Sequence, residues 1–485
     1  MTSAAEHVDI LLIGSGSGNS FPGPEFANRT IAFVDRGVSP RRVFGGTCLN
    51  VGCIPTKMFV HTADVASAPE EAPKLGVDLP DSAVDFPAVR DRVFGRIDAI
   101  SCGGQEYRAD HEDNENLTLV RGTARFTGPK AVTVDLNDGG QRAFTADTVI
   151  IGAGSRPMIP DVPGLRDLDP LTSDTIMRIE QLPESIAVLG TGVIALEFAH
   201  ILRSFGVEVH LIARSDLVLR SYDCDIAERI TEVSRERCTL HTNTSITAAR
   251  READGSVHLT LDEDGESTQL QVGDILVATG RVPNSDLLDA RAGGLGVDEN
   301  GVITVDAFQR VLDPQGRVLE GVWSFGDVSS PVQLKHVANH QQRTMRHNIL
   351  HPDDLRRADE MPVPAAVFTH PQIATVGMTE QQARDWSERS GREIRVAVQK
   401  FSDIAYGWAM ENEGDFLKLI VDAASTEVLG AHIIGPQAPT LIQQFIQAMS
   451  LGITARDMAR HQYWIHPAMP ELVENALLQT FSEDD

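Results

Sequence analysis

Two segments of the chain share one pattern, in which a short apolar run leads into a glycine-rich turn and then into a longer helical stretch. The first run is Val8–Ile13, followed by Gly14-Ser-Gly-Ser-Gly18 and by a second apolar run at Thr30–Val34. The other copy begins with Ser185–Leu189 and continues through Gly190-Thr-Gly192. Apolar runs that stop at glycines are typical of buried parallel strands. The pattern therefore predicts two strand–helix–strand units, each with a dinucleotide site.

Further apolar segments stop at glycine in the same way, at residues 148–154 and 274–280, as strands beside a ligand do. The acidic, proline-containing segment 351–364 is typical of a linker. Beyond it the pattern is mixed, with helical periodicity at 441–451. We therefore expect domain boundaries near residues 154, 282 and 362.

The first turn has most of the features that bind a pyrophosphate. Gly14 allows the tight turn, Gly16 lets the backbone approach the phosphates, and a following helix would direct N–H groups at them. Asp35 follows the glycine turn at the spacing at which an acidic residue of this motif binds a ribose hydroxyl. The third glycine of the fingerprint is replaced by Asn19, and Gly18 comes one place early.

The second turn fits the fingerprint more closely, because Gly190 and Gly192 are followed by the permitted small residue, Ala195. Its second strand ends in Arg214 rather than in an acid, and Arg220 follows. Guanidinium groups favour a 2′-phosphate, whereas a carboxylate would repel it. This pattern indicates NADPH rather than NADH, and two solvated surface arginines are the alternative.

The cysteine pair Cys48 and Cys53 is the most informative feature of the sequence. In a regular α-helix their Cα atoms would be about 8.7 Å apart, beyond the roughly 7 Å limit for a disulfide. A disulfide between them therefore requires a bend at residues 50–52, for which Gly52 is suited. A small reducible disulfide suits a redox couple. Metal ligation and two unrelated buried thiols are the alternatives, and we predict no metal site, since no second Cys/His pair has finger-like spacing.

Composition restricts the partners of this chain. Its 42 Lys and Arg residues stand against 69 Asp and Glu residues, which gives a net charge of −27. No broad basic face for nucleic acid or an anionic membrane can be built from this balance. Five cysteines do not make a disulfide framework, and we find no signal peptide and no apolar stretch of about 20 residues. We expect a cytoplasmic protein with no nucleic-acid or membrane partner.

The string Gly45-Gly-Thr-Cys48-Leu-Asn-Val-Gly-Cys53-Ile-Pro-Thr-Lys57 resembles the FAD-containing pyridine nucleotide-disulfide oxidoreductases. Similar strings lie at 278–284, 322–327, 367–377 and 466–471, so the resemblance covers nearly the whole chain. It implies an α/β fold with two Rossmann-like dinucleotide-binding domains plus a C-terminal α+β dimerisation domain. The expected domains are FAD-binding (1–153 and 283–361), NADPH-binding (154–282) and dimerisation (362–485).

The resemblance also implies the cofactors, FAD and NADPH, and the residues that bind them. The cofactor-binding residues would be Gly14, Gly16, Gly18, Asp35, Gly46, Thr47, Lys57, Gly154, Gly190, Gly192, Arg214, Arg220, Gly280, Gly326 and Asp327. Among these, Asp327 would hold the ribityl chain of FAD.

The catalytic residues implied by the resemblance are Cys48, Cys53, Lys57, Glu197, His466 and Glu471. Cys48 would exchange with substrate and Cys53 would contact the flavin. Glu197 could pair with Lys57 near flavin N5, and a solvated glutamate is the alternative. His466, supported by Glu471, would act on the cysteines of the partner subunit, which implies a homodimer.

The expected substrate is a low-molecular-weight disulfide. Asn19, and the aromatic string Tyr463-Trp464-Ile465 before His466, resemble the members of the family that reduce mycothione. Val193 stands where glutathione-reducing members have a tyrosine. Lipoamide dehydrogenase and glutathione reductase-like activities are alternatives, and a flavin redox sensor without turnover is a more remote one. Mercuric ion reduction is disfavoured because the C-terminal tail lacks a cysteine pair.

Overall fold

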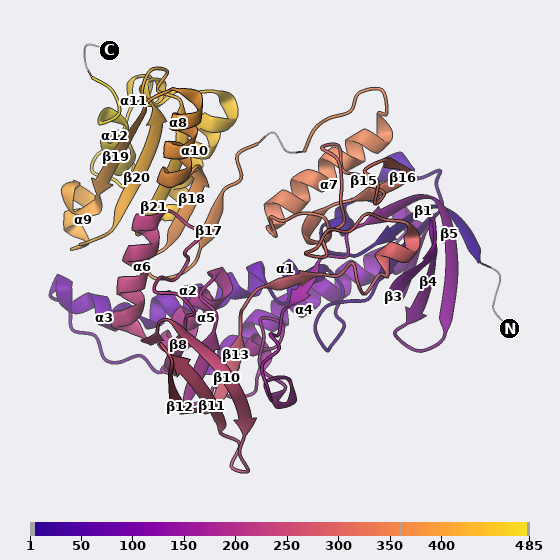
Figure 1. Cartoon of the computed structure of the whole chain (residues 1–485), viewed down its shortest axis with the longest axis horizontal. Helices are drawn as coiled ribbons and strands as arrows, with labels where there is room; N and C mark the ends of the chain where they lie inside the picture. Colours follow the sequence, from indigo (N-terminus) through magenta and orange to yellow (C-terminus); the bar gives the residue numbers. More distant parts are fainter. Residues whose placement is uncertain (1–4, 359–360, 483–485) are drawn as a thin grey trace.

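The computed structural model describes residues 5–358 and 361–482 and builds them around three main sheets (Figure 1). The first sheet, with its helices, is called the first unit. Its strands are β1 (Glu6–Ile13), β2 (Ile31–Asp35), β3 (Leu117–Gly128), β4 (Ala131–Leu136), β5 (Gln141–Ile151), β15 (Arg310–Leu312) and β16 (Val318–Ser324). β1 pairs in parallel with β2 and β5, and β16 joins β5 in parallel. The chain therefore leaves this sheet after β5 and returns to it with β15 and β16.

The second unit is inserted between these two visits. Its four parallel strands have the order β13-β7-β8-β9, and an antiparallel ribbon, β10-β11-β12, lies beside them. Their bounds are β7 (Ser185–Leu189), β8 (Glu208–Ile212), β9 (Thr239–His241), β10 (Thr244–Arg251), β11 (Val257–Glu263), β12 (Glu266–Val272) and β13 (Asp274–Val277). Two short strands, β6 (Ser155–Pro157) and β14 (Arg281–Pro283), pair antiparallel where the chain enters and leaves this unit.

The third unit is an antiparallel sheet of order β17-β18-β21-β20-β19, covered by helices and drawn in orange and yellow in Figure 1. Its strands are β17 (Ala365–Val367), β18 (Ile373–Gly377), β19 (Ile394–Lys400), β20 (Phe416–Asp422) and β21 (Val428–Ile434). Its helices are α8 (Glu380–Ser390), α9 (Ala405–Ala409), α10 (Ala438–Leu451), α11 (Ala455–Arg460) and α12 (Glu471–Leu478).

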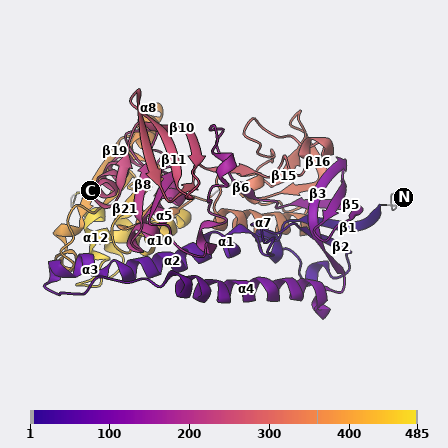
Figure 2. The same cartoon turned by 90° about the horizontal axis from the view of Figure 1, so that it is seen from below.

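The remaining helices belong to the first and second units. They are α1 (Gly46–Asn50), α2 (Cys53–Ala66), α3 (Ala68–Glu71), α4 (Phe86–Asp110), α5 (Val193–Ser204), α6 (Cys224–Arg237) and α7 (Lys335–Leu350). Figure 2 shows α4 lying along one side of the molecule beside α2. α2 of the first unit packs on α5 of the second, and Phe59, Phe198 and Phe205 share one core with Ile434 of the third. This common core holds the units together around the cysteine-bearing helix.

The α/β fold expected from the sequence is present, with one local correction. No α-helix follows the first glycine-rich turn; the chain forms only two 3₁₀ turns, Ser17–Ser20 and Pro24–Phe26. Gly18, Pro22 and Gly23 explain this, because glycine and proline both disfavour a helix interior. The second turn does run into a helix, α5, as expected.

The domain boundaries themselves stay predictions. The described part of the linker, 351–358 and 361–364, contains no helix or strand, and residues 359–360 lie outside the described residues. Residues 1–4, where we expected no signal peptide, lie outside them too. Within 5–358 and 361–482, no helix is long and apolar enough to cross a membrane.

Candidate active site

One continuous cavity of about 1430 Å³ connects the two glycine-rich turns and passes the cysteine pair. The predicted site residues that line it are Gly14, Gly16, Asp35, Gly46, Thr47, Cys48, Cys53, Gly154, Gly190, Gly192, Glu197, Arg214, Arg220, Gly280, Gly326 and Asp327. Gly18, Lys57, His466 and Glu471 are not among the lining residues. The fold thus brings segments far apart in the sequence to a common space.

The first end of the cavity is shaped by close backbone contacts. Gly14 has φ +103°, and a Cβ there would lie 2.2 Å from the carbonyl oxygen of Gly152. A Cβ on Gly46 would lie 2.4 Å from the Cα of Gly16. Only glycine fits at these positions, so the turn stays tight and presents its backbone to the cavity.

Asp35 lies at the end of β2 and is suited to bind a ribose. Its buried carboxylate accepts a hydrogen bond from the Ser15 N–H (3.0 Å) through Oδ1. Its Oδ2 accepts no hydrogen bond from the described residues, although Arg121 lies 3.8 Å away. Burial raises the pKa of this carboxyl. A ribose hydroxyl would supply the missing donor, so this end of the cavity fits an adenosine dinucleotide such as FAD.

Asn19, which replaces the third glycine, has a defined role in the structure. Arg108 of α4 donates from Nε to its side-chain oxygen (2.9 Å) and from Nη2 to its carbonyl oxygen. The buried guanidinium also donates to Asn114 (2.8 Å). The turn is therefore anchored by a side chain from α4 where the standard fingerprint has a helix packed by glycine.

The two cysteines lie on either side of a helix break. α1 ends at Asn50, Val51 leaves helical geometry (φ −144°), and Gly52 is neither helical nor extended (φ −134°, ψ −126°) before Cys53 opens α2. The predicted bend is thus confirmed. Both cysteines are free thiols in this structure. The disulfide itself stays a prediction.

The two thiols differ in acidity because they contact each other. The hydrogen bond from Cys53 lowers the pKa of Cys48, while holding that proton raises the pKa of Cys53. The ammonium of Lys335, the first residue of α7, lowers both pKa values. Cys48 is therefore the first of the two to become a thiolate.

Lys57 and Glu197 approach each other without forming an ion pair. The buried Glu197 accepts a hydrogen bond from the Phe368 N–H (3.0 Å). The ammonium of Lys57 lies 4.1 Å from the centroid of the Phe368 ring, a cation–π contact. Burial raises the pKa of Glu197 to about 7, only partly opposed by the Phe368 N–H and the charge of Lys57. Phe368, at the start of the third unit, thus stands where we expected a direct salt bridge.

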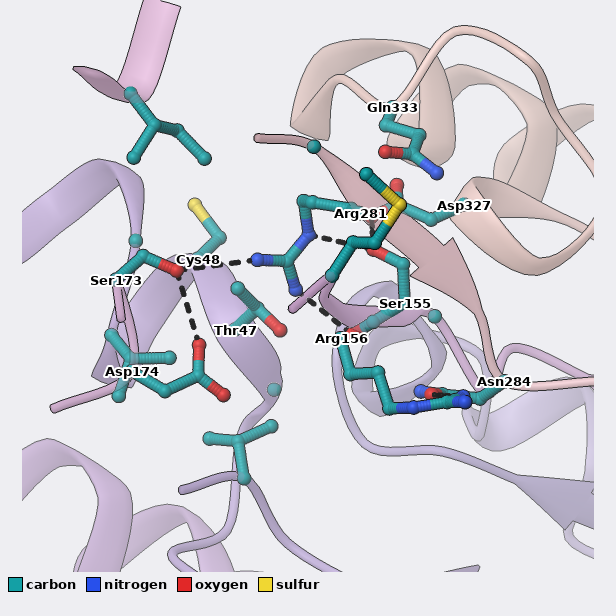
Figure 3. Close-up of a pocket in the computed structure, with 18 of the residues that line it drawn as sticks. Thr47, Cys48, Ser155, Arg156, Ser173, Asp174, Arg281, Asn284, Asp327 and Gln333 are labelled. Carbon is teal, nitrogen blue, oxygen red and sulfur yellow. Dashed lines mark hydrogen bonds between the residues drawn. The ribbon is translucent and has the colours of Figure 1, made fainter. Parts of the chain in front are cut away.

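Sequence reasoning missed a hydrogen-bonded chain that fixes Asp327 (Figure 3). Arg281 donates from Nε to Ser155 Oγ (2.8 Å), and Ser155 Oγ donates to Asp327 Oδ2 (2.7 Å). Arg281 also donates to Ser173 Oγ (3.4 Å) in the second unit. Arg281 belongs to the string 278–284 that carried the resemblance, but its contacts depend on the pairing of β6 with β14.

The second end of the cavity has the same close backbone contact at its glycine turn as the first end. Gly190 has φ +122°, and a Cβ there would lie 2.4 Å from the carbonyl oxygen of Ala278. Arg214 and Arg220 are exposed and line the cavity. Among the residues in 5–358 and 361–482, neither guanidinium has a carboxylate within 4 Å. These two free cations fit a phosphate group.

His466 and Glu471 meet in the third unit, outside the cavity. The imidazole Nδ1 lies 3.4 Å from Glu471 Oε2, and the His466 side chain is 67% exposed while that of Glu471 is 19% exposed. The imidazole is thus oriented by a carboxylate and free to reach another molecule.

Comparison with known proteins agrees with this geometry. The family model "Pyridine nucleotide-disulphide oxidoreductase" matches residues 8–343, and the dimerisation domain of the same family matches residues 363–477. The chain belongs to this family. Members use FAD and NAD(P)H and act on disulfides. Membership therefore establishes an oxidoreductase with a flavin and a pyridine nucleotide, and it establishes a dimerisation domain.

Individual relatives cover almost the entire chain. Mycothione reductase of Mycobacterium tuberculosis is 46% identical over 98% of this chain and 99% of its own length. Dihydrolipoyl dehydrogenase of Haloferax volcanii is 32% identical over 98% of this chain and 97% of its own. The HOCl-induced flavoprotein disulfide reductase RclA of Escherichia coli superposes with a TM-score of 0.82 at 25% identity, covering 97% of this chain and 99% of that one.

The raised pKa of Glu197 generates a pH-dependent prediction. An unfolded glutamate has a pKa of 4.5, so the stability that the protonated carboxyl provides is lost as the pH rises from there through about 7. Relative to Glu197→Gln, the free energy of unfolding of the cofactor-free protein should fall by about 3 kcal/mol across this window. It should not fall further at higher pH. Urea unfolding at a series of pH values measures the difference. Glu184→Gln, at an exposed glutamate of the same unit, should show no such trend; a pH-independent difference for Glu197→Gln contradicts the assignment.

Proposed function

We propose that this chain is a cytoplasmic, NADPH-dependent reductase of a low-molecular-weight disulfide, mycothione in particular, acting through FAD and the Cys48–Cys53 pair. The observation that carries the proposal is the single cavity, in which two dinucleotide-type turns flank the two cysteines. The 46% identity with a mycothione reductase over nearly the whole chain supports the choice of substrate.

The residues at the first end of the cavity fit FAD. The turn at Gly14 and Gly16 would receive the pyrophosphate, and Asp35 the ribose. Asp327, oriented by Ser155 and Arg281, would accept a hydrogen bond from the ribityl chain. When bound there, FAD supplies transfer of two electrons from the nicotinamide to the cysteine disulfide.

The cysteines would carry the exchange with substrate. The Cys48 thiolate attacks one sulfur of the substrate disulfide, and the other sulfur leaves as a thiol after taking a proton. Cys53 then gives up its proton and attacks the Cys48 sulfur, which releases the second substrate thiol and re-forms the Cys48–Cys53 disulfide. The lower pKa of Cys48 supports its role as the attacking group.

His466 would supply the proton for the first leaving thiol, in the active site of the partner subunit. Its imidazole is exposed, lies outside the cavity of its own chain and is paired with Glu471. A histidine in contact with a carboxylate is a suitable acid–base group for thiol–disulfide exchange. The dimerisation domain that includes residues up to 477 supports a homodimer.

The nucleotide would be NADPH because Arg214 and Arg220 border the second end of the cavity as unpaired cations. A 2′-phosphate between them would form charge-assisted hydrogen bonds. An acid at Arg214 would instead favour NADH.

Steady-state turnover tests the substrate and the role of Cys48. With NADPH as donor, kcat/KM should be highest for mycothione and far lower for glutathione disulfide and lipoamide. Cys48→Ser should reduce turnover to background, whereas NADPH should still bleach the flavin absorbance, because the nucleotide end is intact. A yellow protein that reduces none of the three disulfides would favour the redox sensor. Highest turnover with lipoamide would favour a lipoamide dehydrogenase.

Hybrid dimers test the placement of His466. Neither Cys48→Ser nor His466→Gln homodimers should reduce the disulfide efficiently. Mixed dimers of the two variants should regain activity, because one of the two sites then combines an intact cysteine pair with an intact histidine. Co-expression with two affinity tags isolates the mixed dimer. If both groups act within one chain, the hybrid stays inactive.

Substitution of the two arginines tests the nucleotide. Arg214→Ala and Arg220→Ala should each lower kcat/KM for NADPH about tenfold to a hundredfold, as expected for the loss of a hydrogen bond to a charged group. The value for NADH should change little, since NADH has no 2′-phosphate. Arg166→Ala, on a surface turn of the same unit, is a suitable control. Equal losses with both nucleotides would contradict the assignment.

A further inference from the structure

A buried lysine joins the third unit to the loop that borders the nucleotide end of the cavity. Lys418 lies on β20 and is 1% exposed. Its Nζ lies 2.9 Å from Asp223 Oδ1, 2.8 Å from Asp225 Oδ2 and 2.5 Å from Glu380 Oε2. A charged lysine is rarely buried unless it is paired. These three contacts stabilise the ammonium and raise its pKa.

The carboxylates around Lys418 belong to two different units. Asp223 and Asp225 open α6 of the second unit, whereas Glu380 opens α8 of the third. The Glu380 N–H also donates to Asp223 Oδ2 (2.9 Å). Asp223, which is 1% exposed, is therefore held from the third unit by both an ion pair and a backbone hydrogen bond.

The loop that ends at Asp223 is part of the nucleotide end of the cavity. It follows β8 and contributes four lining residues, Arg214, Ser215, Arg220 and Tyr222. Within the second unit it is held by the Leu219 N–H, which donates to the carbonyl oxygen of Thr191 in the glycine turn (3.0 Å).

The conformation of this loop needs external support. Leu219 has φ +48°, in the left-handed region that a leucine rarely adopts. Arg220 follows it directly and has no carboxylate partner among the described residues. Before Arg220 the loop is also held by the Val218 N–H, which donates to Thr231 Oγ1 (3.0 Å). After Arg220 it is held from the third unit by the Lys418–Asp223 contact, so the direction of the Arg220 side chain depends on anchors on both sides.

We propose that Lys418 is a positioning residue for the nucleotide: by holding Asp223 it places Arg220 to bind the 2′-phosphate of NADPH. The inference rests on the function proposed above. It gives the third unit, the one that also carries His466, a part in choosing the reductant. Without Lys418, the carboxylates of Asp223, Asp225 and Glu380 would face one another, and among the described residues the cation still in contact with them would be Arg384 on Glu380 Oε1. Their repulsion would drive Asp223 outward, and Arg220 would move with it.

The test is Lys418→Met in the full-length, FAD-loaded dimer. The dissociation constant for NADP⁺, measured by calorimetry, should rise about tenfold, and the preference for NADPH over NADH in kcat/KM should fall by the same factor. FAD content, the dissociation constant for NAD⁺ and the KM for the disulfide should stay unchanged, because only the 2′-phosphate contact is displaced. Lys400→Met, at an exposed lysine of β19 in the same unit, should match the wild type in every measurement.

Two further variants separate positioning from a general loss of folding. Asp223→Asn keeps the side-chain oxygen that caps α6 but loses the ion pair. It should therefore bind NADP⁺ more weakly with NAD⁺ binding unchanged, and the effect should be smaller than in Lys418→Met. Lys418→Arg keeps the charge and should restore part of the preference. If Lys418→Met fails to fold, Asp223→Asn decides the question.

The outcomes distinguish this inference from the proposed function. A wild type that binds NADP⁺ and NAD⁺ equally contradicts the proposed nucleotide, and with it the inference. A wild type that prefers NADP⁺, combined with an unchanged preference in Lys418→Met and Asp223→Asn, contradicts the inference alone. If Lys418→Met binds NADP⁺ and NAD⁺ equally more weakly, or loses FAD, Lys418 has only a structural role. Either result also overturns the inference.

Discussion

The close approach of a glycine turn to the neighbouring strand is the constraint on which both ends of the cavity depend. At Gly14 the turn lies against the carbonyl of Gly152, and at Gly190 it lies against the carbonyl of Ala278, with no room for a side chain in either case. The same contact in two units opens the carboxyl edge of each parallel sheet to a ligand. The two openings share one space only because helices from different units pack together, and α2 on α5 is the main such contact.

The helix that carries Cys53 is therefore also the element around which the three units pack together. α2 belongs to the first unit and packs on α5 of the second, and the core around it includes residues of the third. Glu197 of α5 and Phe368 of the third unit meet Lys57 beside the cysteine pair. The electrostatics of the redox pair are thus set by all three units. Burial at this junction raises the pKa of the Glu197 carboxyl to about 7, because no ion pair with Lys57 offsets the loss of solvent.

The chain has a net charge of −27, and a few of its cationic side chains lie at functionally important positions. Among the six lysines, Lys335 helps to lower the pKa of Cys48, Lys57 lies over the ring of Phe368, and Lys418 joins two units through three carboxylates. Within residues 5–358 and 361–482, neither Arg214 nor Arg220 has a carboxylate within 4 Å. An acidic surface repels anionic ligands in general, so two cations at the second end of the cavity favour binding of an additional phosphate there.

The sequence by itself determined the features that depend on neighbours along the chain: two glycine turns after apolar runs, the spacing of Cys48 and Cys53 with the break it requires, and the family strings. Fold class and family follow from these and are confirmed. The tertiary structure decided what depends on distant contacts. Arg108 anchors the first turn where we expected a helix, Phe368 contacts both Lys57 and Glu197, and Lys418 holds Asp223. Spacing along a chain constrains local backbone geometry, whereas the partner of a buried charge is chosen by packing between elements that the sequence pattern does not place relative to one another.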